Sequence, residues 1–368
     1  MNKRWKLSIL IGTFFLLLIL VGNWFFDEEN SLFGGESSQK QASNQEDNFS
    51  KADRQKNIDK IINETHFQGS VLLVNQDQIF YQQSYGYADA QEKRPNKIDG
   101  PFPIASLQKI ITGSIVLELV KEGKVKLSTT LDTFYPDIDL SQAITIQQLL
   151  DHNSGIFMAE EEPELLLKDQ DSQIENALTV MSVTSNKEFN YTNVNYTLLA
   201  GIISKLTGQP YEEVVRKRVI DKLSLTHTYF WDDVPKDVII PRPYYYMGED
   251  YQADPFPASE KLFSSLLGAG NMYMSTEDFW SFIQSLANGQ LFEQTEYERL
   301  AGTKEEGYQA GIVYFGDLKY SEGNLGGYDT VIYGDQDNKN VVILFANQPA
   351  DDGMRALSEE LYDQLLEM

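Results

Sequence analysis

The chain of 368 residues contains no cysteine. Disulfides, thiol catalysis, cysteine-held zinc and a cysteine-anchored lipid are therefore excluded. Histidine is also scarce: the chain has only His66, His152 and His227, and none lies in a metal-binding pair such as H-E-x-x-H. No glycine-rich nucleotide loop is present. We expect no metal and no cofactor, and we expect His152, which follows two leucines and precedes a turn, to be a packed structural residue.

Basic residues are in deficit. The 30 Lys and Arg are outnumbered by 55 Asp and Glu, which gives a formal net charge of −25. Nucleic acid is therefore not an expected partner, because phosphate binding needs a basic surface. An acidic surface is compatible with cationic or amine-bearing partners, although a merely soluble acidic surface is the simpler interpretation.

Charge is absent from one long stretch, residues 7–26. Twenty helical residues span about 30 Å, the thickness of the hydrocarbon core of a membrane. Residues 1–6 carry Lys3, Arg4 and Lys6 and form a basic flank that should stay cytoplasmic. A cleaved signal peptide is the alternative, but bulky Trp24-Phe25-Phe26 stands where small residues would mark cleavage. We therefore expect an uncleaved single-pass membrane anchor, with the remainder of the chain outside the cell.

Residues 27–56 are polar and rich in Ser, Gln, Asn and Glu, which predicts a flexible linker. The folded extracellular domain is expected over 57–368. Within it, 235–257 is rich in proline and tyrosine without clean periodicity. We interpret that segment as an ordered loop whose aromatic residues pack, and which is a candidate wall of a cleft.

The order of predicted elements indicates the fold class. A hairpin of two strands is expected over 69–74 and 78–83, and helical patterns follow. Strands are expected again near the end, over 311–315, 328–333 and 341–345, before a closing helix over 352–368. This order favours an α+β fold, in which helices flank an antiparallel sheet and a mainly helical subdomain is inserted between its halves.

Ser106 and Lys109 lie in a predicted buried helix over 104–123. Residues three apart on a helix are neighbours on one face. A serine hydroxyl is a weak nucleophile until a base takes its proton, and a buried lysine can be that base. The pattern Ser-x-x-Lys is short, however, and it also occurs at Ser37–Lys40 in the linker. The motif therefore needs further partners.

Such a partner is Tyr191-Thr192-Asn193, which precedes another predicted buried helix. A tyrosine near a lysine can transfer protons, and an asparagine can hold both a lysine and a substrate amide. Alone, the tripeptide would more often be a turn or a cap. No serine lies in a G-x-S-x-G elbow, which argues against an α/β-hydrolase triad.

Taken together, these motifs resemble those of the serine β-lactamase and penicillin-binding-protein family, in its class C-like branch. Ser106-Leu107-Gln108-Lys109 matches the first motif and Tyr191-Thr192-Asn193 the second. Similar phrases surround them in family order, from about Gly69 to Gln348: FPIASLQK, LVKEGKVKL, ITIQQLLDHNSG, NYTLLAGIISKLTG, LSLTHTYF and VVILFANQ.

The resemblance implies an acyl-enzyme route. Ser106 would attack a carbonyl, Lys109 and Tyr191 would move protons, and Asn193 would orient the substrate. The backbone N–H of Ser106 would be one oxyanion donor. The second would come from a strand that bears His or Lys, then Thr or Ser, then Gly.

The matching stretch departs from that pattern. In Glu322–Gly327, Asn324 replaces the His or Lys, Leu325 replaces the hydroxyl residue, Gly326 is the motif glycine and Gly327 would supply the second N–H. Asn324 and Gly326 would then contact substrate. The missing cation disfavours a substrate carboxylate, as in penicillin or a peptide ending in D-alanine, by about 1.5–3 kcal/mol.

A D-alanyl ester of teichoic acid has no such carboxylate. Enzymes of the family that the chain resembles hydrolyse such esters outside Gram-positive membranes. The resemblance and the missing cation together therefore favour a membrane-anchored, extracellular serine hydrolase of D-alanine-containing envelope polymers, as a D-alanyl esterase. The alternatives are a D,D-carboxypeptidase or penicillin-binding protein, and a catalytically inactive binding module on the same fold.

Overall fold

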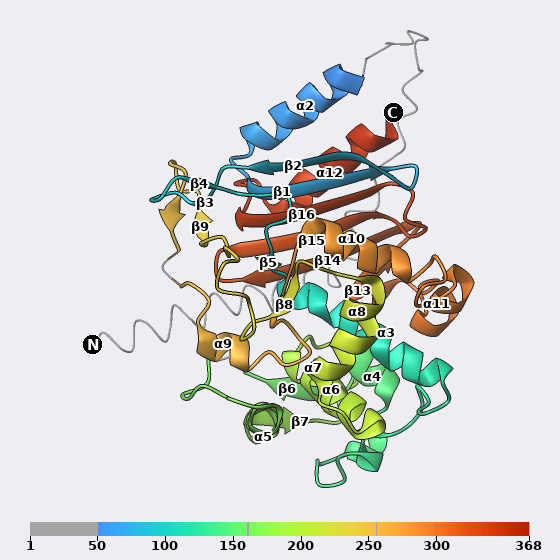
Figure 1. Cartoon of the computed structure of the whole chain (residues 1–368). Helices are drawn as coiled ribbons and strands as arrows, with labels where there is room; N and C mark the ends of the chain where they lie inside the picture. Colours follow the sequence, from blue (N-terminus) through green and yellow to red (C-terminus); the bar gives the residue numbers. More distant parts are fainter. Residues whose placement is uncertain (1–50, 160–161, 255, 368) are drawn as a thin grey trace.

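A computed structural model describes residues 51–159, 162–254 and 256–367 (Figure 1). The predicted anchor over 7–26 and most of the predicted linker lie outside these residues. Within the described part, no helix has both the length and the apolar character needed to cross a membrane. The first described helix, α2 (Lys51–Glu64), begins before the expected domain start at residue 57. Its buried face consists of Ile58, Ile61 and Ile62, spaced as one stripe of a helix.

The centre of the fold is a seven-stranded antiparallel sheet in the order β12-β13-β14-β15-β16-β1-β2. The chain enters it as the hairpin β1 (Gln68–Asn75) and β2 (Gln78–Tyr85). The other strands come from the end of the chain: β12 (Gly307–Gln309), β13 (Ile312–Phe315), β14 (Leu318–Leu325), β15 (Tyr328–Asp335) and β16 (Val341–Gln348). Strand β1 joins the N-terminal hairpin to the C-terminal strands by pairing with β16, from Gln68 opposite Gln348 to Val74 opposite Val341.

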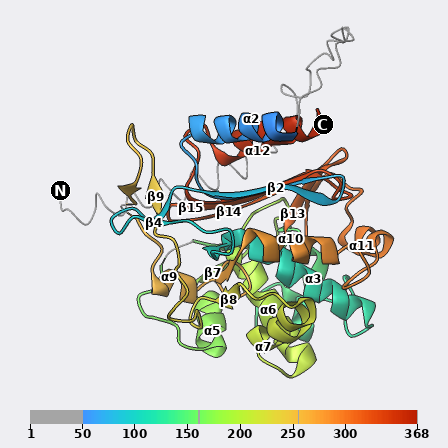
Figure 2. The same cartoon turned by 45° about the horizontal axis from the view of Figure 1, so that its top comes forward.

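Both faces of the sheet are covered by helices, and the strands β1 and β16 are buried along almost their whole length. One face packs against α2 and the closing helix α12 (Met354–Leu366), which lie side by side above the sheet in Figure 2. The opposite face packs against α3 (Gln108–Lys121) and α10 (Thr276–Ser285). Because side chains alternate along a strand, Val331 faces α12 while Ile332 faces α3.

The segment between the two parts of the sheet is mainly helical. It contains α4 (Ile146–Leu150), α5 (Gln170–Val180), α6 (Asn193–Thr207), α7 (Tyr211–Val215), a π-helical turn η4 (Arg216–Ile220), α8 (Asp221–Leu223), α9 (Glu260–Ser264) and α11 (Gln294–Ala301). It also contains short 3₁₀ turns η1 (Ala105–Leu107), η2 (Leu131–Thr133) and η3 (Ser141–Ala143). Minor strands complete it: β3 (Tyr87–Asp89), β4 (Arg94–Pro95), β5 (Phe102–Pro103), β6 (Ile156–Met158), β7 (Met181–Val183), β8 (Thr228–Phe230), β9 (Tyr244–Tyr245), β10 (Gln252–Ala253) and β11 (Met272–Met274). The predicted α+β fold with an inserted helical subdomain is confirmed.

The tyrosine-rich segment forms the small hairpin β9–β10 at one end of the sheet (Figure 1). Its aromatic residues pack as expected: Tyr251 contacts the rings of Tyr87 and Tyr244. The backbone N–H of Tyr251 donates to the side chain of Gln348 at the end of β16, at 2.6 Å. The hairpin β9–β10 is therefore attached to the end of β16.

Candidate active site

Ser106 lies in the turn η1, which leads directly into α3. The first backbone N–H groups of a helix have no intrahelical partner and lie at the positive end of its dipole. The preceding residue, Ala105, has a φ of 45°, which a residue with a side chain rarely adopts. Such strain is concentrated at functional sites. Ser106 itself is only partly buried, unlike its neighbours Ala105 and Leu107.

Lys109 lies one turn along the helix and is fully buried. Its Nζ is 2.9 Å from Ser106 Oγ, 2.7 Å from Asn193 Oδ1 and 3.0 Å from the carbonyl oxygen of Ala269. Asn193 Oδ1 and the Ala269 carbonyl accept two protons from either form of the amine, so that the neutral amine can turn its lone pair toward Ser106 Oγ. Nζ also lies 4.8 Å from the ring centre of Tyr191, a cation–π distance. The amine is therefore held against the Ser106 hydroxyl from several directions.

Tyr191 reaches the same oxygen from a different part of the chain. Its hydroxyl donates to Ser106 Oγ at 2.7 Å. Asn193, the first residue of α6, is the one that accepts the hydrogen bond from Lys109. The structure thus brings together Ser106, Lys109, Tyr191 and Asn193, the four residues that the two sequence motifs singled out.

His152 packs against Tyr191 and accepts a hydrogen bond from the backbone that follows it. It is fully buried, and its Nδ1 lies 3.3 Å from the backbone N of Thr192 and 3.0 Å from Nδ2 of Asn195. Both of those groups donate, so Nδ1 is the acceptor and the neutral ring carries its proton on Nε2. Burial lowers the pKa of His152 well below its usual value, and nearby Lys109 adds to this effect. The histidine is packed, as expected from the sequence, and positions the backbone beside Tyr191.

The third part of the site is strand β14. Here the structure differs from the predicted alignment of the third motif with the sequence. A Cβ built on Gly323 would lie 2.9 Å from the backbone N of Ser106 and 2.4 Å from the carbonyl oxygen of Ile104. Strand β14 therefore approaches the nucleophile at Gly323, where only a hydrogen fits. Gly323 is then the motif glycine. Ser321 replaces the His or Lys of the motif, and Glu322 replaces its Thr or Ser.

The residues predicted to contact substrate lie elsewhere. Asn324 shares the α12 face of the sheet with Tyr320, away from Ser106, and donates to Asp329 Oδ2 at 3.4 Å. Gly326 and Gly327 form the turn after β14 and approach the tyrosine-rich loop. A Cβ on Gly326 would be 2.7 Å from Phe256 O, and one on Gly327 would be 2.4 Å from Asp254 Oδ2. The assignments of Asn324, Gly326 and Gly327 therefore need correction, because the glycine-rich stretch was placed three residues out of register.

The corrected register still supplies no cation. Along Tyr320–Leu325 the sequence contains no Lys or Arg, and Ser321 donates its hydroxyl to the carbonyl oxygen of Gly311 at 2.8 Å. Leu325 packs with Ala105. The wall that faces the nucleophile is therefore neutral and partly apolar, apart from its backbone groups.

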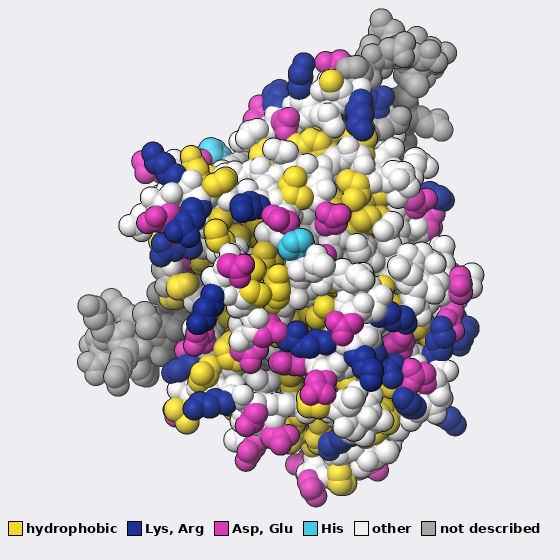
Figure 3. Space-filling view, viewed as in Figure 1, with side chains coloured by type: hydrophobic (Ala, Val, Ile, Leu, Met, Phe, Trp, Pro, Cys, Tyr) yellow, Lys and Arg dark blue, Asp and Glu magenta, His cyan; other side chains and the backbone are white. Residues whose placement is uncertain are grey.

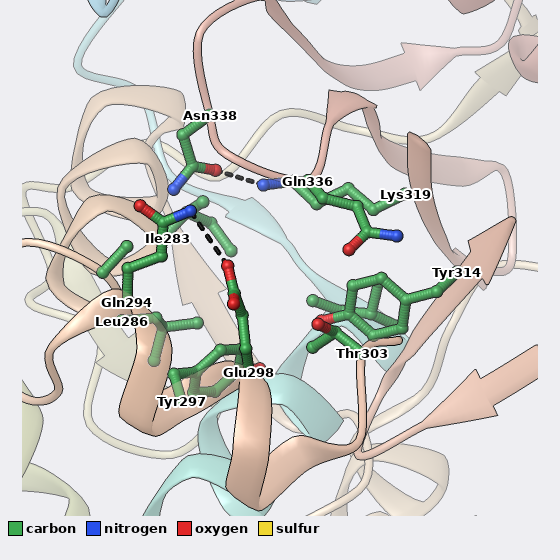
Figure 4. Close-up of a pocket in the computed structure, with 12 residues that line it drawn as sticks. Ile283, Leu286, Gln294, Tyr297, Glu298, Thr303, Tyr314, Lys319, Gln336 and Asn338 are labelled. Carbon is green, nitrogen blue, oxygen red and sulfur yellow. Dashed lines mark hydrogen bonds between the residues drawn. The ribbon is translucent and has the colours of Figure 1, made fainter. Parts of the chain in front are cut away.

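A separate cavity opens near the beginning of β14, between α10, α11 and the sheet (Figure 4). Its lining includes Lys319, Glu298, Tyr314 and Asn338, and Lys319 Nζ donates to Asn338. Burial lowers the pKa of Lys319 to about 7. The cavity measures about 30 Å³, which is enough for only one or two water molecules. None of the Ser106 cluster lines it, so it is not the substrate site.

Comparison with known proteins agrees with this geometry. A family model described as Beta-lactamase matches residues 54–366. The chain is 28% identical to the penicillin-binding protein PbpX of Bacillus subtilis, over 90% of this chain and 83% of that protein. It is 27% identical to a teichoic acid D-alanine hydrolase of Staphylococcus aureus, over 86% of this chain and 79% of that protein.

Solved structures show the same architecture. FmtA from Staphylococcus aureus superposes with a TM-score of 0.76 and 25% identity, covering 87% of this chain and 90% of FmtA. A D-amino acid amidase from Ochrobactrum anthropi superposes with a TM-score of 0.70 at 21% identity, over 86% of this chain and 98% of the amidase, and shares the fold. The chain belongs to the Beta-lactamase family and is a serine hydrolase of that family.

Proposed function

We propose that this serine hydrolase removes D-alanine from alanylated teichoic acid at the outer face of the cytoplasmic membrane. The observation that carries the proposal is a contrast within the site. Ser106 Oγ lies 2.9 Å from Lys109 Nζ and 2.7 Å from Tyr191 OH, whereas the part of β14 beside the nucleophile, Tyr320–Leu325, contains no Lys or Arg. Such a site is equipped for acyl transfer, but it is poorly equipped to hold a substrate carboxylate.

The proposed reaction has two steps. In the first, Lys109 as the neutral amine takes the proton of Ser106 while Oγ attacks the ester carbonyl. The ester C–O bond then breaks, the polymer leaves as an alcohol with a proton delivered through Tyr191, and D-alanine stays esterified to Ser106. In the second, the same groups take a proton from water, which attacks the acyl-enzyme and releases D-alanine with the Ser106 hydroxyl restored.

The oxyanion of each tetrahedral intermediate needs two N–H donors. The backbone N–H of Ser106 at the start of the helix is one of them. The edge of β14 next to Gly323 is the source of the second, because it is the strand that touches the Ser106 backbone. Asn193, held by Lys109, is placed to orient the substrate.

The D-alanyl group suits this environment. It carries an ammonium and, as an ester, no free carboxylate. The chain has a formal net charge of −25, although Figure 3 shows acidic and basic side chains interspersed on the visible face. The net negative charge of the chain attracts a cationic group over a distance. The visible face has no single acidic patch that would bind this group. The similarity to a teichoic acid D-alanine hydrolase supports the same substrate class.

The location is part of the proposal. The uncharged stretch over 7–26 would anchor the chain, and the polar residues that follow it would let the domain reach polymers in the cell wall. The similarity to PbpX favours a second candidate, a penicillin-binding protein acting on D-alanine peptides.

Purified protein should release D-alanine from alanylated teichoic acid, and a Ser106→Ala variant should release no more than buffer. Equal release by the two proteins would refute the esterase. Penicillin and a fluorophosphonate then separate the two candidates. Labelling by the fluorophosphonate without labelling by penicillin supports the esterase, whereas labelling by both, with release of D-alanine from a D-Ala-D-Ala peptide, supports the peptidase.

A further inference from the structure

Thr330 lies in β15, directly opposite Gly323 of β14. Thr330 is fully buried. Its neighbours in the strand face the α12 side of the sheet: Val331 packs in the cluster with α12, and Asp329 accepts a hydrogen bond from Asn324. The Thr330 side chain therefore points to the other face, toward the turn that carries the nucleophile. Its hydroxyl contacts confirm this direction.

The Thr330 hydroxyl sits between two carbonyl groups. Oγ1 is 3.1 Å from the carbonyl oxygen of Ile104 and 3.1 Å from the carbonyl oxygen of Gly323. A hydroxyl has one proton, so these two acceptors share it or take it in turn. Both acceptors are backbone atoms of the site: Ile104 immediately precedes the strained Ala105, and Gly323 is the residue against the Ser106 backbone.

These contacts form a bridge behind the catalytic serine. The gap between β14 and the Ser106 N–H has to hold the substrate oxyanion, and a shift of about 1 Å in such a gap can cost about 100-fold in rate. We propose that Thr330 is a positioning residue that sets this gap, by joining Ile104 and Gly323 through its hydroxyl. It acts through backbone atoms and does not contact the substrate. The inference depends on acyl transfer at Ser106, and not on which ester is the natural substrate.

Two pairs of variants isolate the hydroxyl. Thr330→Val keeps the shape of the side chain and removes the hydroxyl, whereas Thr330→Ser keeps the hydroxyl and removes the methyl group. Thr330→Ala compared with Thr330→Ser repeats the test with less bulk, in case valine prevents folding. Thermal unfolding identifies the variants that are folded.

The first readout is the second-order rate at which a fluorophosphonate labels Ser106 in the full-length protein. We expect Thr330→Val, and Thr330→Ala, to slow labelling by about 10- to 100-fold, and Thr330→Ser to stay within about threefold of the native rate. The second readout is hydrolysis of a small activated ester. There the loss should appear in kcat with KM nearly unchanged, because the oxyanion contact forms only in the transition state.

Labelling at the native rate by a folded Thr330→Val or Thr330→Ala variant would overturn the proposal. Equal losses in Thr330→Ser and Thr330→Ala would also overturn it, because the methyl group and not the hydroxyl would then matter. Neither readout requires teichoic acid. A failure of the D-alanyl esterase assignment would therefore leave this test intact.

Discussion

The two halves of the active site are built in different ways. Around Ser106 the chemistry is carried by side chains, with Lys109 Nζ and Tyr191 OH both hydrogen-bonded to one hydroxyl oxygen. Along β14 the contribution comes from the backbone, because the strand approaches Ser106 at a glycine and points the side chain of Asn324 to the opposite face. The first half keeps the pattern of the family, and the second half departs from it.

This difference explains how reactivity and specificity can change separately. A proton-transfer cluster requires particular functional groups, so a replacement there removes the reaction. An oxyanion donor on the backbone does not depend on the side chains beside it as long as Gly323 is kept. The neighbouring positions are therefore free to lose the cation that would select a carboxylate. The predictions below test that division, beginning with the largest expected effect.

Removal of the nucleophile or its base should abolish the reaction. We expect Ser106→Ala and Lys109→Met each to lower kcat for hydrolysis of an activated ester by at least about 10³-fold, since residues that act as one unit fail together. Lys319→Met is a matched control, because Lys319 is also a buried lysine but lines the separate cavity. A loss of the same size in the control would mean that burying methionine, and not the missing amine, is responsible.

Removal of the Tyr191 hydroxyl should have a smaller effect. Tyr191→Phe keeps the ring beside Lys109 and deletes the group that donates to Ser106 Oγ. We expect kcat to fall by about 10²- to 10⁴-fold. Tyr308→Phe serves as the control, because its ring lies in the same aromatic group around His152. If Tyr191→Phe keeps native kcat, proton transfer does not pass through this residue.

The register of β14 can be tested with two glycines. Gly323→Ala would place a methyl group 2.4 Å from Ile104 O and 2.9 Å from Ser106 N, so we expect at least about a 100-fold slower labelling of Ser106. Gly327→Ala adds strain at a φ of 71°, worth about 1–2 kcal/mol of stability, but should label within about threefold of the native rate. If Gly327→Ala slows labelling more than Gly323→Ala does, the alignment predicted from the sequence, with Gly327 as the oxyanion donor, is correct after all.

The last prediction concerns pH and stability, and not the rate of the reaction. Burial raises the pKa of Asp151 from its ordinary value to about 7, so the folded protein keeps a proton that the unfolded chain has already lost. The stabilisation from this proton is complete at low pH and disappears as the pH rises from about 4 through about 7, by at most about 1.4 kcal/mol per pH unit. Asp151→Asn should remove this part of the pH dependence of urea unfolding. If the free energy of unfolding depends on pH in the same way in both proteins, the raised pKa of Asp151 is contradicted.

Much of the fold and the side-chain half of the site could be predicted from the sequence. Strands over 69–74, 328–333 and 341–345 are rich in apolar and β-branched residues, and the expected ranges fall within β1, β15 and β16. Ser106 and Lys109 are linked by helical spacing, and Tyr191-Thr192-Asn193 is the only such tripeptide in the chain. These signals are local, so no knowledge of the tertiary structure was needed.

The remainder depends on contacts that sequence spacing does not specify. Strand β14 is polar and contains Gly323, with Gly326 and Gly327 just beyond it, so several alignments of the third motif fit the letters. Only the packing against η1 selects Gly323. Alternation along the strand was a usable signal, because it separates Asn324 from the face that carries Leu325. The bridge through Thr330 gives no sequence signal at all, since its two partners are main-chain carbonyls.

The acylation of Ser106 is tested most directly by mass spectrometry of the full-length protein after exposure to a fluorophosphonate. Our account predicts a single covalent adduct per chain, located on the peptide that contains Ser106 and absent from the Ser106→Ala variant. A folded protein that stays unlabelled, or one that is labelled on a different residue, would contradict it.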